Sequence, residues 1–227
     1  RVSGGYLSEG DTITITFGDT SEGSPGFKMQ TMVESAFEFK VLVDPCAVMH
    51  WVPILDQPAI AIVPGSPRHW KAVMSTLRRP GEPFQLGVKV EDDWGNPSDQ
   101  VETTLRLEPS LPVCGLPNTL EFVAGNKAIQ IENLRVTEEG ELTIKVLEDA
   151  TGKFLCEAGP LIVQDGVYGG YWGDLHGQSG ESIGITNARE YFDFARNIAF
   201  LDVISHQAND FQVNNAFWAH LNELTAK

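Results

Sequence analysis

Two histidines in the last part of the chain stand where an imidazole could do chemistry. His176 belongs to the stretch YWGDLHGQSGE, residues 171–181, and His206 ends the stretch FLDVISH, residues 200–206. Neutral imidazole nitrogens bind borderline metals such as zinc and iron, and a bound metal can activate water for hydrolysis. A metal site is therefore one hypothesis for these residues, provided that the fold brings the two rings together.

The segments around both histidines predict alternating strands and helices. Residues 167–175 and 200–204 are typical of strands, and Asn187 followed by Glu190 is a helix-start signal. Asn214 or Asn215 can cap a second helix. Apolar side chains recur at helical spacing after both caps: Ala188, Tyr191, Phe192, Ala195, Ile198 and Ala199, then Phe217, Trp218, Leu221 and Leu224. This order of elements predicts an α/β fold with parallel strands.

Parallel strands joined by a right-handed crossover would place both histidines at one edge of a sheet. His176 and His206 each follow the C-terminal end of a predicted strand, and ligands collect at that edge in α/β folds. A lone histidine there is more often structural. Two at equivalent positions leave the structural and the metal-binding interpretations evenly balanced.

These motifs resemble the first two βα units of the PHP (polymerase and histidinol phosphatase) metal-dependent hydrolases. The matching features are YWGDLHG at 171–177, YFDFAR at 191–196, LDVISHQ at 201–207, and Trp218. They are similar still more closely to a family known as a domain of unknown function, in which β-sandwich segments precede a PHP-like domain. The resemblance implies a distorted barrel whose strand ends bind divalent metal (zinc, iron or manganese) and hydrolyse phosphate esters.

Carried over residue by residue, the resemblance implies three metal ligands. His176 matches the first histidine of an H-x-H pair, and His206 matches the histidine that ends the second strand. Gln178 stands where the second histidine is usual, and it offers only a neutral amide oxygen. Ile183 and Ser205 stand where aspartates are usual. A metal cluster built on this chain would therefore lose charge and ligands.

Two acids near His176 are candidate catalytic residues. Glu181 lies in the same loop and could compensate for Ile183 by reaching a metal or a water molecule, or it could be a solvated loop acid. Asp174 could orient the His176 ring without binding the metal itself, although an acid in a strand-end turn often has a purely structural role. Asp202 and Asp210 are weaker candidates, and the histidines at positions 50, 69 and 220 are interpreted as structural or surface residues.

Two other patterns carry less weight. Residues 177–181, GQSGE, resemble a G-x-S-x-G nucleophile elbow, but the last glycine is missing and no Asp and His follow in the required order. Residues 91–99 are rich in acids that could bind calcium, yet the fixed spacing of a calcium loop is absent. A solvated β-turn explains this second stretch better.

The chain before residue 166 has the two-residue period of half-buried antiparallel strands. Turn residues separate the predicted strands, which lie at 12–17, 37–41, 86–90, 104–107, 120–123, 128–131, 141–146 and 161–163. A Pro- and Gly-rich break falls at 63–67. We therefore expect a protein that is mainly β with an α/β tail: an N-terminal β segment (1–65, part of a sandwich), an immunoglobulin-like β-sandwich (66–165) and the start of a PHP-like barrel (166–227).

Both ends of this division are expected to be incomplete. Residues 1–63 hold too few strands for a sandwich, so they either complete a sheet begun upstream of Arg1 or pack on the second sandwich. A (β/α) barrel takes roughly 200 or more residues, and residues 166–227 supply only two units. We expect a fragment of a longer protein that is inactive by itself.

Composition narrows the class of protein. The 227 residues are 42% hydrophobic, which is typical of a globular protein, and the net charge of −15 disfavours nucleic acid as a partner. No apolar run approaches the roughly 18 residues of a membrane span. The three cysteines predict reduced, mostly buried thiols. A cytoplasmic location is favoured, with a removed signal peptide left open because the chain begins with Arg1.

Two functions from different classes follow from these patterns. The first is part of a PHP-like metal-dependent hydrolase that acts on a small-molecule or phosphate-ester substrate, with a homo-oligomer possible. The second is a non-catalytic binding or scaffold protein, in which the sandwiches bind glycan or protein and the PHP-like site has decayed. The substitutions at Gln178, Ile183 and Ser205 favour the second, and the paired strand-end histidines favour the first.

Overall fold

The computed structural model describes residues 8–46 and 48–226. The chain divides into two units, Arg1–Thr31 and Met32–Lys227. In the first unit the described residues form turns and extended chain, and residues 12–17, predicted as a strand, are in no strand. That prediction is wrong because alternation alone cannot form a strand: Ile13 and Ile15 have no core to enter and are 61% and 68% exposed.

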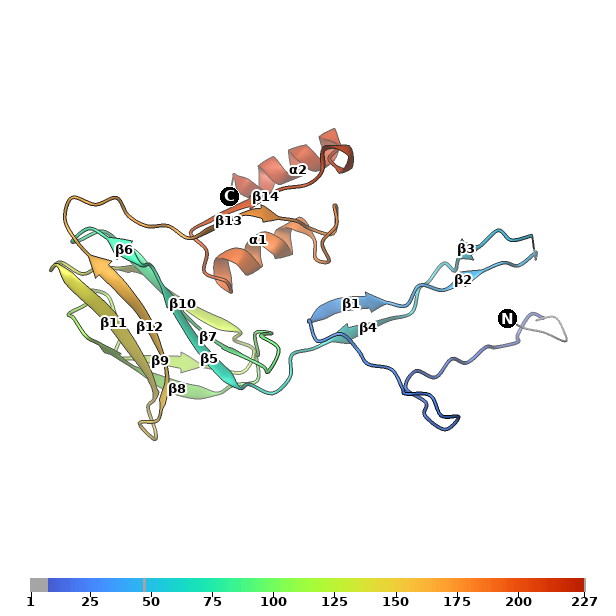
Figure 1. Ribbon diagram of the computed structural model, residues 1–227, viewed down its shortest axis with the longest axis horizontal. Coiled ribbons are helices and arrows are strands. Elements are labelled where there is room, and N and C mark those ends of the chain that lie inside the picture. The colour runs from blue at the N-terminus through green and yellow to red at the C-terminus, as the bar shows by residue number, and fades with distance from the viewer. Residues whose placement is uncertain (1–7, 47, 227) are drawn as a thin grey trace. The chain divides into compact units, whose positions relative to one another are not determined.

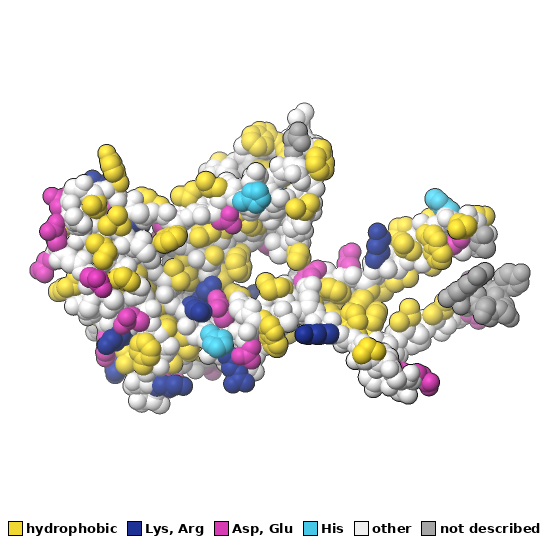
Figure 2. Space-filling view, viewed as in Figure 1, with side chains coloured by type: hydrophobic (Ala, Val, Ile, Leu, Met, Phe, Trp, Pro, Cys, Tyr) yellow, Lys and Arg dark blue, Asp and Glu magenta, His cyan; other side chains and the backbone are white. Residues whose placement is uncertain are grey.

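The second unit is mainly β, with several sheets and two α-helices among its described residues. Its first part forms two small antiparallel sheets, β1 (Glu34–Glu38) with β4 (Ala59–Ile62), and β2 (Leu42–Val43) with β3 (Val52–Pro53). Of the strand predicted at 37–41, only residues 37 and 38 lie in β1, and residues 39–41 lie in no strand. Figure 2 shows hydrophobic side chains gathered along this part of the chain, where Trp51, Leu55 and Ile60 are exposed.

Two larger sheets follow and share one hydrophobic core (Figure 1). The first has the order β10 (Ala128–Leu134), β7 (Phe84–Glu91), β5 (His69–Met74). The second has the order β6 (Leu77–Arg78), β12 (Phe154–Val163), β11 (Gly140–Glu148), β8 (Thr103–Pro109), β9 (Thr119–Phe122). All pairs are antiparallel except β6 with β12. The six strands predicted between 86 and 163 are confirmed, and β5 and β6 were missed.

The core forms because alternate residues of the central strands point between the two sheets. Leu86 and Val88 of β7 face Leu142 and Ile144 of β11, and all four side chains are fully buried. Burial of each aliphatic side chain of this size contributes about 1.5–3 kcal/mol. Aromatic packing joins the sheets as well, because Trp70 of β5 meets Phe122 of β9 edge to face at 5.2 Å between ring centroids.

Asp92 at the end of β7 is a buried junction, so the solvated turn predicted for residues 91–99 is found only at the exposed residues 93–95. The residue is only 2% exposed. Its Oδ1 accepts the backbone N–H groups of Trp94 and Asn96, both at 2.9 Å. Its Oδ2 accepts the Gly65 N–H at 2.9 Å and the Asn96 Nδ2 at 2.8 Å, and Asn96 Oδ1 accepts the Val33 N–H. Both carboxylate oxygens face N–H donors, which disfavours calcium there.

The Asp92 carboxylate gives the protein an acid-sensitive junction. Burial raises its pKa, but the hydrogen bonds from Asn96, Gly65 and Trp94 outweigh burial and lower the pKa from 3.8 to about 2. The folded pKa lies below the unfolded one, so the stabilisation is complete above 3.8 and is lost as the pH falls toward 2.

We expect the stability difference between the protein and its Asp92→Asn variant to shrink on acidification. The reason is that the variant lacks the titrating carboxylate, whereas the protein loses about 2 kcal/mol of stabilisation between about pH 5 and about pH 2. Urea unfolding of both proteins across this range measures the change, and other acids cancel in the comparison. Parallel losses of stability in the two proteins would contradict the assignment.

The α/β tail follows in the predicted order of strand, helix, strand and helix. Strands β13 (Gly173–Gly177) and β14 (Val203–His206) are parallel. Asn187 caps α1 (Ala188–Asn197) by accepting the Glu190 N–H, and Asn214 caps α2 (Asn215–Thr225) in the same way. A short 3₁₀ turn, η1 (Asp210–Gln212), lies between β14 and α2. The two helices lie on opposite sides of the strand pair (Figure 1).

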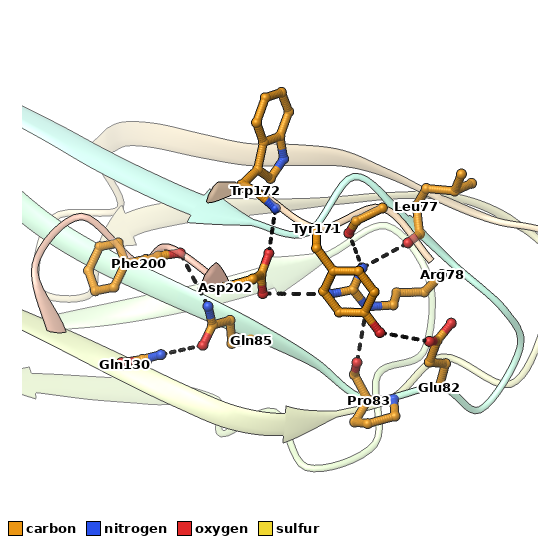
Figure 3. Close-up of polar contacts among 11 residues, drawn as sticks. Leu77, Arg78, Glu82, Pro83, Gln85, Gln130, Tyr171, Trp172, Phe200 and Asp202 are labelled. Carbon is orange, nitrogen blue, oxygen red and sulfur yellow. Dashed lines mark hydrogen bonds and ion pairs between the residues drawn. The ribbon is translucent and has the colours of Figure 1, made fainter. Parts of the chain in front are cut away.

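Arg78 of β6 joins this tail to the sheets through hydrogen bonds and an ion pair (Figure 3). Its side chain is 3% exposed, and its guanidinium donates to the carbonyls of Leu77 (2.9 Å), Pro83 (3.1 Å) and Gly170. Its Nη2 lies 3.7 Å from the Asp202 Oδ1, just before β14. Arg78 therefore joins the sheets to the segments that precede both β13 and β14.

Residues around this ion pair complete the junction. Asp202 Oδ2 accepts the Trp172 N–H at 2.9 Å. The Arg78 guanidinium lies over the Tyr171 ring, 4.4 Å from its centroid, and the Tyr171 hydroxyl donates to Glu82 at 3.2 Å. Asp202, a weak candidate for catalysis in the sequence, thus serves as the partner of a buried arginine.

Phe200 makes the second contact between tail and sheets. Its ring is 3% exposed and covers Gly87 of β7, where an added Cβ would lie 2.3 Å from the ring. Its carbonyl accepts the Gln85 Nε2 at 3.2 Å. The glycine within the alternating run of β7 is therefore required by the close approach of the Phe200 ring.

The three cysteines are unpaired, as expected, but they are not mostly buried. Cys46 and Cys114 are exposed, and only Cys156 of β12 is half-buried. Burial raises the pKa of the Cys156 thiol to about 11, against the opposing charge of Lys71. In the part of the chain that the structure describes, no helix has the length and apolar character to span a membrane.

Candidate functional site

The parallel pair β13–β14 brings the two histidine-bearing loops to one edge, as the sequence predicts. Gly177 is the register partner of His206, and the Gln207 N–H donates to the Gly177 carbonyl at 2.8 Å. Residues 176–181 therefore begin beside His206. The register shifts between Asp174 and Gly177, so the simple alternation of side chains along β13 is interrupted just before this edge.

His206 is the centre of the observed site. Its ring is half-buried, between Tyr191 of α1 at 6.0 Å and Phe217 of α2 at 5.4 Å, both edge-on by ring centroids. Its Nε2 lies 2.8 Å from the Ser179 Oγ and 3.2 Å from the Ser179 backbone nitrogen. The tail thus fixes both the plane of the imidazole and the position of one ring nitrogen.

Ser179 links His206 to Glu181. The serine is fully buried, and its hydroxyl donates to the Glu181 Oε2. Glu181 Oε1 accepts the Ala188 N–H at 3.3 Å, at the start of α1. Burial raises the pKa of Glu181, but the hydrogen bonds from Ser179 and Ala188 outweigh it, so the pKa is lowered and the carboxylate stays ionised near neutral pH.

The two contacts of His206 Nε2 favour opposite tautomers of the imidazole. If the Ser179 hydroxyl proton lies on the Glu181 side, Oγ can only accept, so Nε2 must carry a hydrogen and Nδ1 keeps its lone pair. The Ser179 backbone N–H favours the opposite tautomer, in which Nε2 accepts. Burial lowers the pKa of His206, against the opposing charge of Glu181, so the ring is neutral. A metal on Nδ1 would select the first tautomer.

Two buried polar atoms at this edge lack a partner among the described residues. They are His206 Nδ1 and Gln178 Oε1, and the only other such atom is Ser75 Oγ, in the sheets. An unpaired buried polar atom costs about 1–3 kcal/mol. An imidazole nitrogen and an amide oxygen are both metal donors, so these two atoms fit a divalent metal in donor type.

The remaining predicted site residues are placed differently. The His176 side chain is exposed, and Asp174 Oδ1 accepts the His176 backbone N–H at 2.8 Å, which gives Asp174 a role in the turn. Ile183 is exposed as well. Within residues 8–46 and 48–226, no group of at least three His, Cys, Asp or Glu side chains could hold a metal. The side chain of Asp210 lies outside the described residues.

The loop that holds Ser179 depends on close packing of backbone and side chains. The Tyr191 hydroxyl donates to the Ser205 carbonyl at 2.9 Å, and burial raises its pKa, so it stays protonated. A Cβ at Gly177 would lie 1.5 Å from that hydroxyl, and a Cβ at Gly184 would lie 2.6 Å from the Gln178 carbonyl. Only glycine fits at both positions.

Ser179 is the site residue that sequence reasoning missed. Its signal was the partial elbow GQSGE, which the sequence analysis considered only as a nucleophile. The short Ser179–His206 distance resembles a nucleophile with its base, but the geometry disfavours that chemistry. The serine is inaccessible. In a catalytic triad the acid bonds to the imidazole, whereas here Glu181 bonds to the serine.

No protein-family model matches this chain, and a search of curated proteins finds no match either.

Proposed function

We propose that the β13–β14 edge is part of a PHP-like metal-dependent hydrolase site that acts on phosphate esters. The observation that carries the proposal is the half-buried, neutral His206, whose Nδ1 lacks a partner among the described residues, at the same edge as the unpaired Gln178 Oε1. The metal would be zinc, iron or manganese, and when bound it would supply an activated water molecule.

Neighbouring residues of this chain would orient the metal ligands and set the tautomer of His206. Glu181 accepts from the Ser179 hydroxyl, and with a metal on Nδ1 that hydroxyl would accept from His206 Nε2. Gln178 would add a neutral oxygen. His176, two residues earlier, is exposed and would have to turn toward the edge to add a further nitrogen. A bound cation would also offset the negative charges of Asp174 and Glu181, which would otherwise repel a phosphate group.

We expect zinc to bind the protein and His206→Asn to weaken that binding at least about tenfold, because the variant loses the Nδ1 lone pair. Calorimetric titration with zinc alone measures the affinity. Nitrogen NMR of the imidazole shows whether Nδ1 of His206 is the atom that changes. Gln178→Ala should weaken binding less, because an amide oxygen is the poorer ligand.

His220→Ala is the matched control for this test. His220 lies on the exposed face of α2, so its loss should leave zinc affinity unchanged. Equal weakening by His206→Asn and His220→Ala, or no binding at all, would overturn the proposed metal site.

A non-catalytic binding or scaffold protein is the second candidate. The observation in its favour is that the described residues assemble no group of three metal-binding side chains. In that case the sheets would bind glycan or protein, and the β13–β14 edge would be a decayed site. Phosphatase activity toward p-nitrophenyl phosphate that disappears in His206→Asn would exclude this candidate.

A further inference from the structure

We infer that Glu181 is a positioning residue that sets the tautomer of His206 before any metal binds. Acting through the Ser179 hydroxyl, it holds the imidazole with its hydrogen on Nε2 and its lone pair on Nδ1. This role rests on the proposed metal site, which gives the Nδ1 lone pair its use. It differs from the direct contact with metal or water that the sequence suggests for Glu181.

The Glu181 carboxylate is held between a buried serine and the start of α1. Its Oε2 accepts the Ser179 hydroxyl, and its Oε1 accepts the Ala188 backbone N–H at 3.3 Å. Ser179 and Ala188 are both fully buried, so the two donors have fixed positions. Because an ionised carboxylate can only accept, the Ser179 hydroxyl must be the donor in its bond to Glu181.

The direction of this bond leaves Ser179 Oγ as an acceptor for His206. Oγ lies 2.8 Å from Nε2, whereas the competing Ser179 backbone nitrogen lies 3.2 Å from it. A hydroxyl that donates to a carboxylate becomes a better acceptor, because hydrogen bonds in a chain polarise one another. The shorter and stronger contact therefore favours a hydrogen on Nε2.

The surroundings of the second ring nitrogen of His206 favour the same tautomer. Nδ1 is buried and has no hydrogen-bond partner among the described residues. A hydrogen on Nδ1 would be a buried donor without an acceptor, and such orphaned N–H groups are rarer in proteins than acceptors that lack a donor. The Nε2–H tautomer avoids this cost, and its free Nδ1 is the form of the atom that a metal requires.

Nitrogen NMR of the metal-free chain tests this role, because the two ring nitrogens show which one carries the hydrogen. We expect Nε2–H to predominate in the parent protein and Nδ1–H in Glu181→Gln. The glutamine oxygen is needed by the Ala188 N–H, so its NH₂ group faces Ser179, and the serine hydroxyl must donate to Nε2. Ser179→Ala should have the same effect, because only the backbone N–H then faces Nε2. Zinc affinity should fall about tenfold in both variants.

Glu190→Gln is the matched control. Glu190 is exposed in the first turn of α1, so its replacement removes the same charge nearby without touching Ser179. The control should leave both the tautomer and the zinc affinity unchanged. An effect equal to that of Glu181→Gln would mean that charge alone acts, and it would overturn the positioning role.

A double variant separates action through the serine from direct contact with the metal. Ser179→Ala with Glu181→Gln should bind zinc no more weakly than Ser179→Ala alone, because Glu181 acts through Ser179. A further loss in the double variant would overturn the positioning role, and so would a parent protein in the Nδ1–H form. Because the tautomer is measured without metal, failure of zinc binding alone would count against the proposed metal site and not against this role.

Discussion

Replacing Arg78 with methionine is expected to lower the free energy of unfolding by about 3–5 kcal/mol. The change keeps an apolar stem but leaves the Asp202 carboxylate without its cation and the Gly170 carbonyl without its donor, and such losses at buried ion pairs are large. It also removes the cation from the Tyr171 ring. Urea unfolding followed by circular dichroism and tryptophan fluorescence measures the loss.

Arg106→Met is the matched control. Arg106 of β8 lies 3.1 Å from Glu108 and 3.6 Å from Asp149, but all three side chains are well exposed. Pairs of this kind contribute about 0–1 kcal/mol, so the control should change stability little. Similar losses in the two variants would show that burial of the Arg78 junction is not what stabilises it.

Asp92→Ala is expected to destabilise the protein by about 3–5 kcal/mol, because it removes a buried carboxylate and leaves its donors unpaired. The backbone N–H groups of Gly65, Trp94 and Asn96 would all lose their acceptor. The Asn96 side chain would also lose the bond that positions it to accept the Val33 N–H. Chemical unfolding measures the loss. Hydrogen exchange at Gly65 and Val33 should accelerate with it.

The neighbouring acid provides a stringent control for this variant. Asp93 is exposed, with a surface ion pair to Arg68 at 3.9 Å and a surface contact with His69 at 3.6 Å. Asp93→Ala should therefore stay within about 0.5 kcal/mol of the parent protein. A small loss in Asp92→Ala, comparable to that of Asp93→Ala, would refute the view that residue 92 is a structural junction.

Strand prediction succeeded where the sequence pattern and a shared core agree. Residues 86–90 and 141–146 alternate, and both lie in central strands whose inner side chains face the opposite sheet. Residues 12–17 alternate just as cleanly but form no strand, and Ile13 and Ile15 stay exposed. A local pattern shows that a strand can bury one face, and it cannot show what would cover that face.

The order of the tail was predictable because its signals are local. Asn187 and Asn214 cap helices, and apolar spacing marks the helix faces. From this order the parallel pairing and the shared edge of His176 and His206 followed correctly. The exposure of His176 did not follow, because the irregular register between Asp174 and Gly177 is invisible in the sequence.

Buried polar contacts were the least predictable part of the structure. Arg78 lies in LRR, residues 77–79, which reads as a surface turn, and Asp92 lies in an acidic stretch that reads as solvated. Ser179 reads as one small residue in a glycine-rich loop. Each is buried because partners distant in the sequence, such as Asp202, Gly65 and His206, are brought to it by the fold.

The short length of β14 has a consequence for communication within the protein. Its four residues span about 13 Å. Asp202, immediately before the strand, is held by Arg78 of the sheets, and His206 ends the strand at the proposed metal edge. A displacement of the sheets would therefore be transmitted to the imidazole along one extended peptide. If the proposed metal binds at His206 and its binding shifts β14, a molecule that alters the Arg78–Asp202 contact would be thermodynamically coupled to it, and the coupling would be reciprocal.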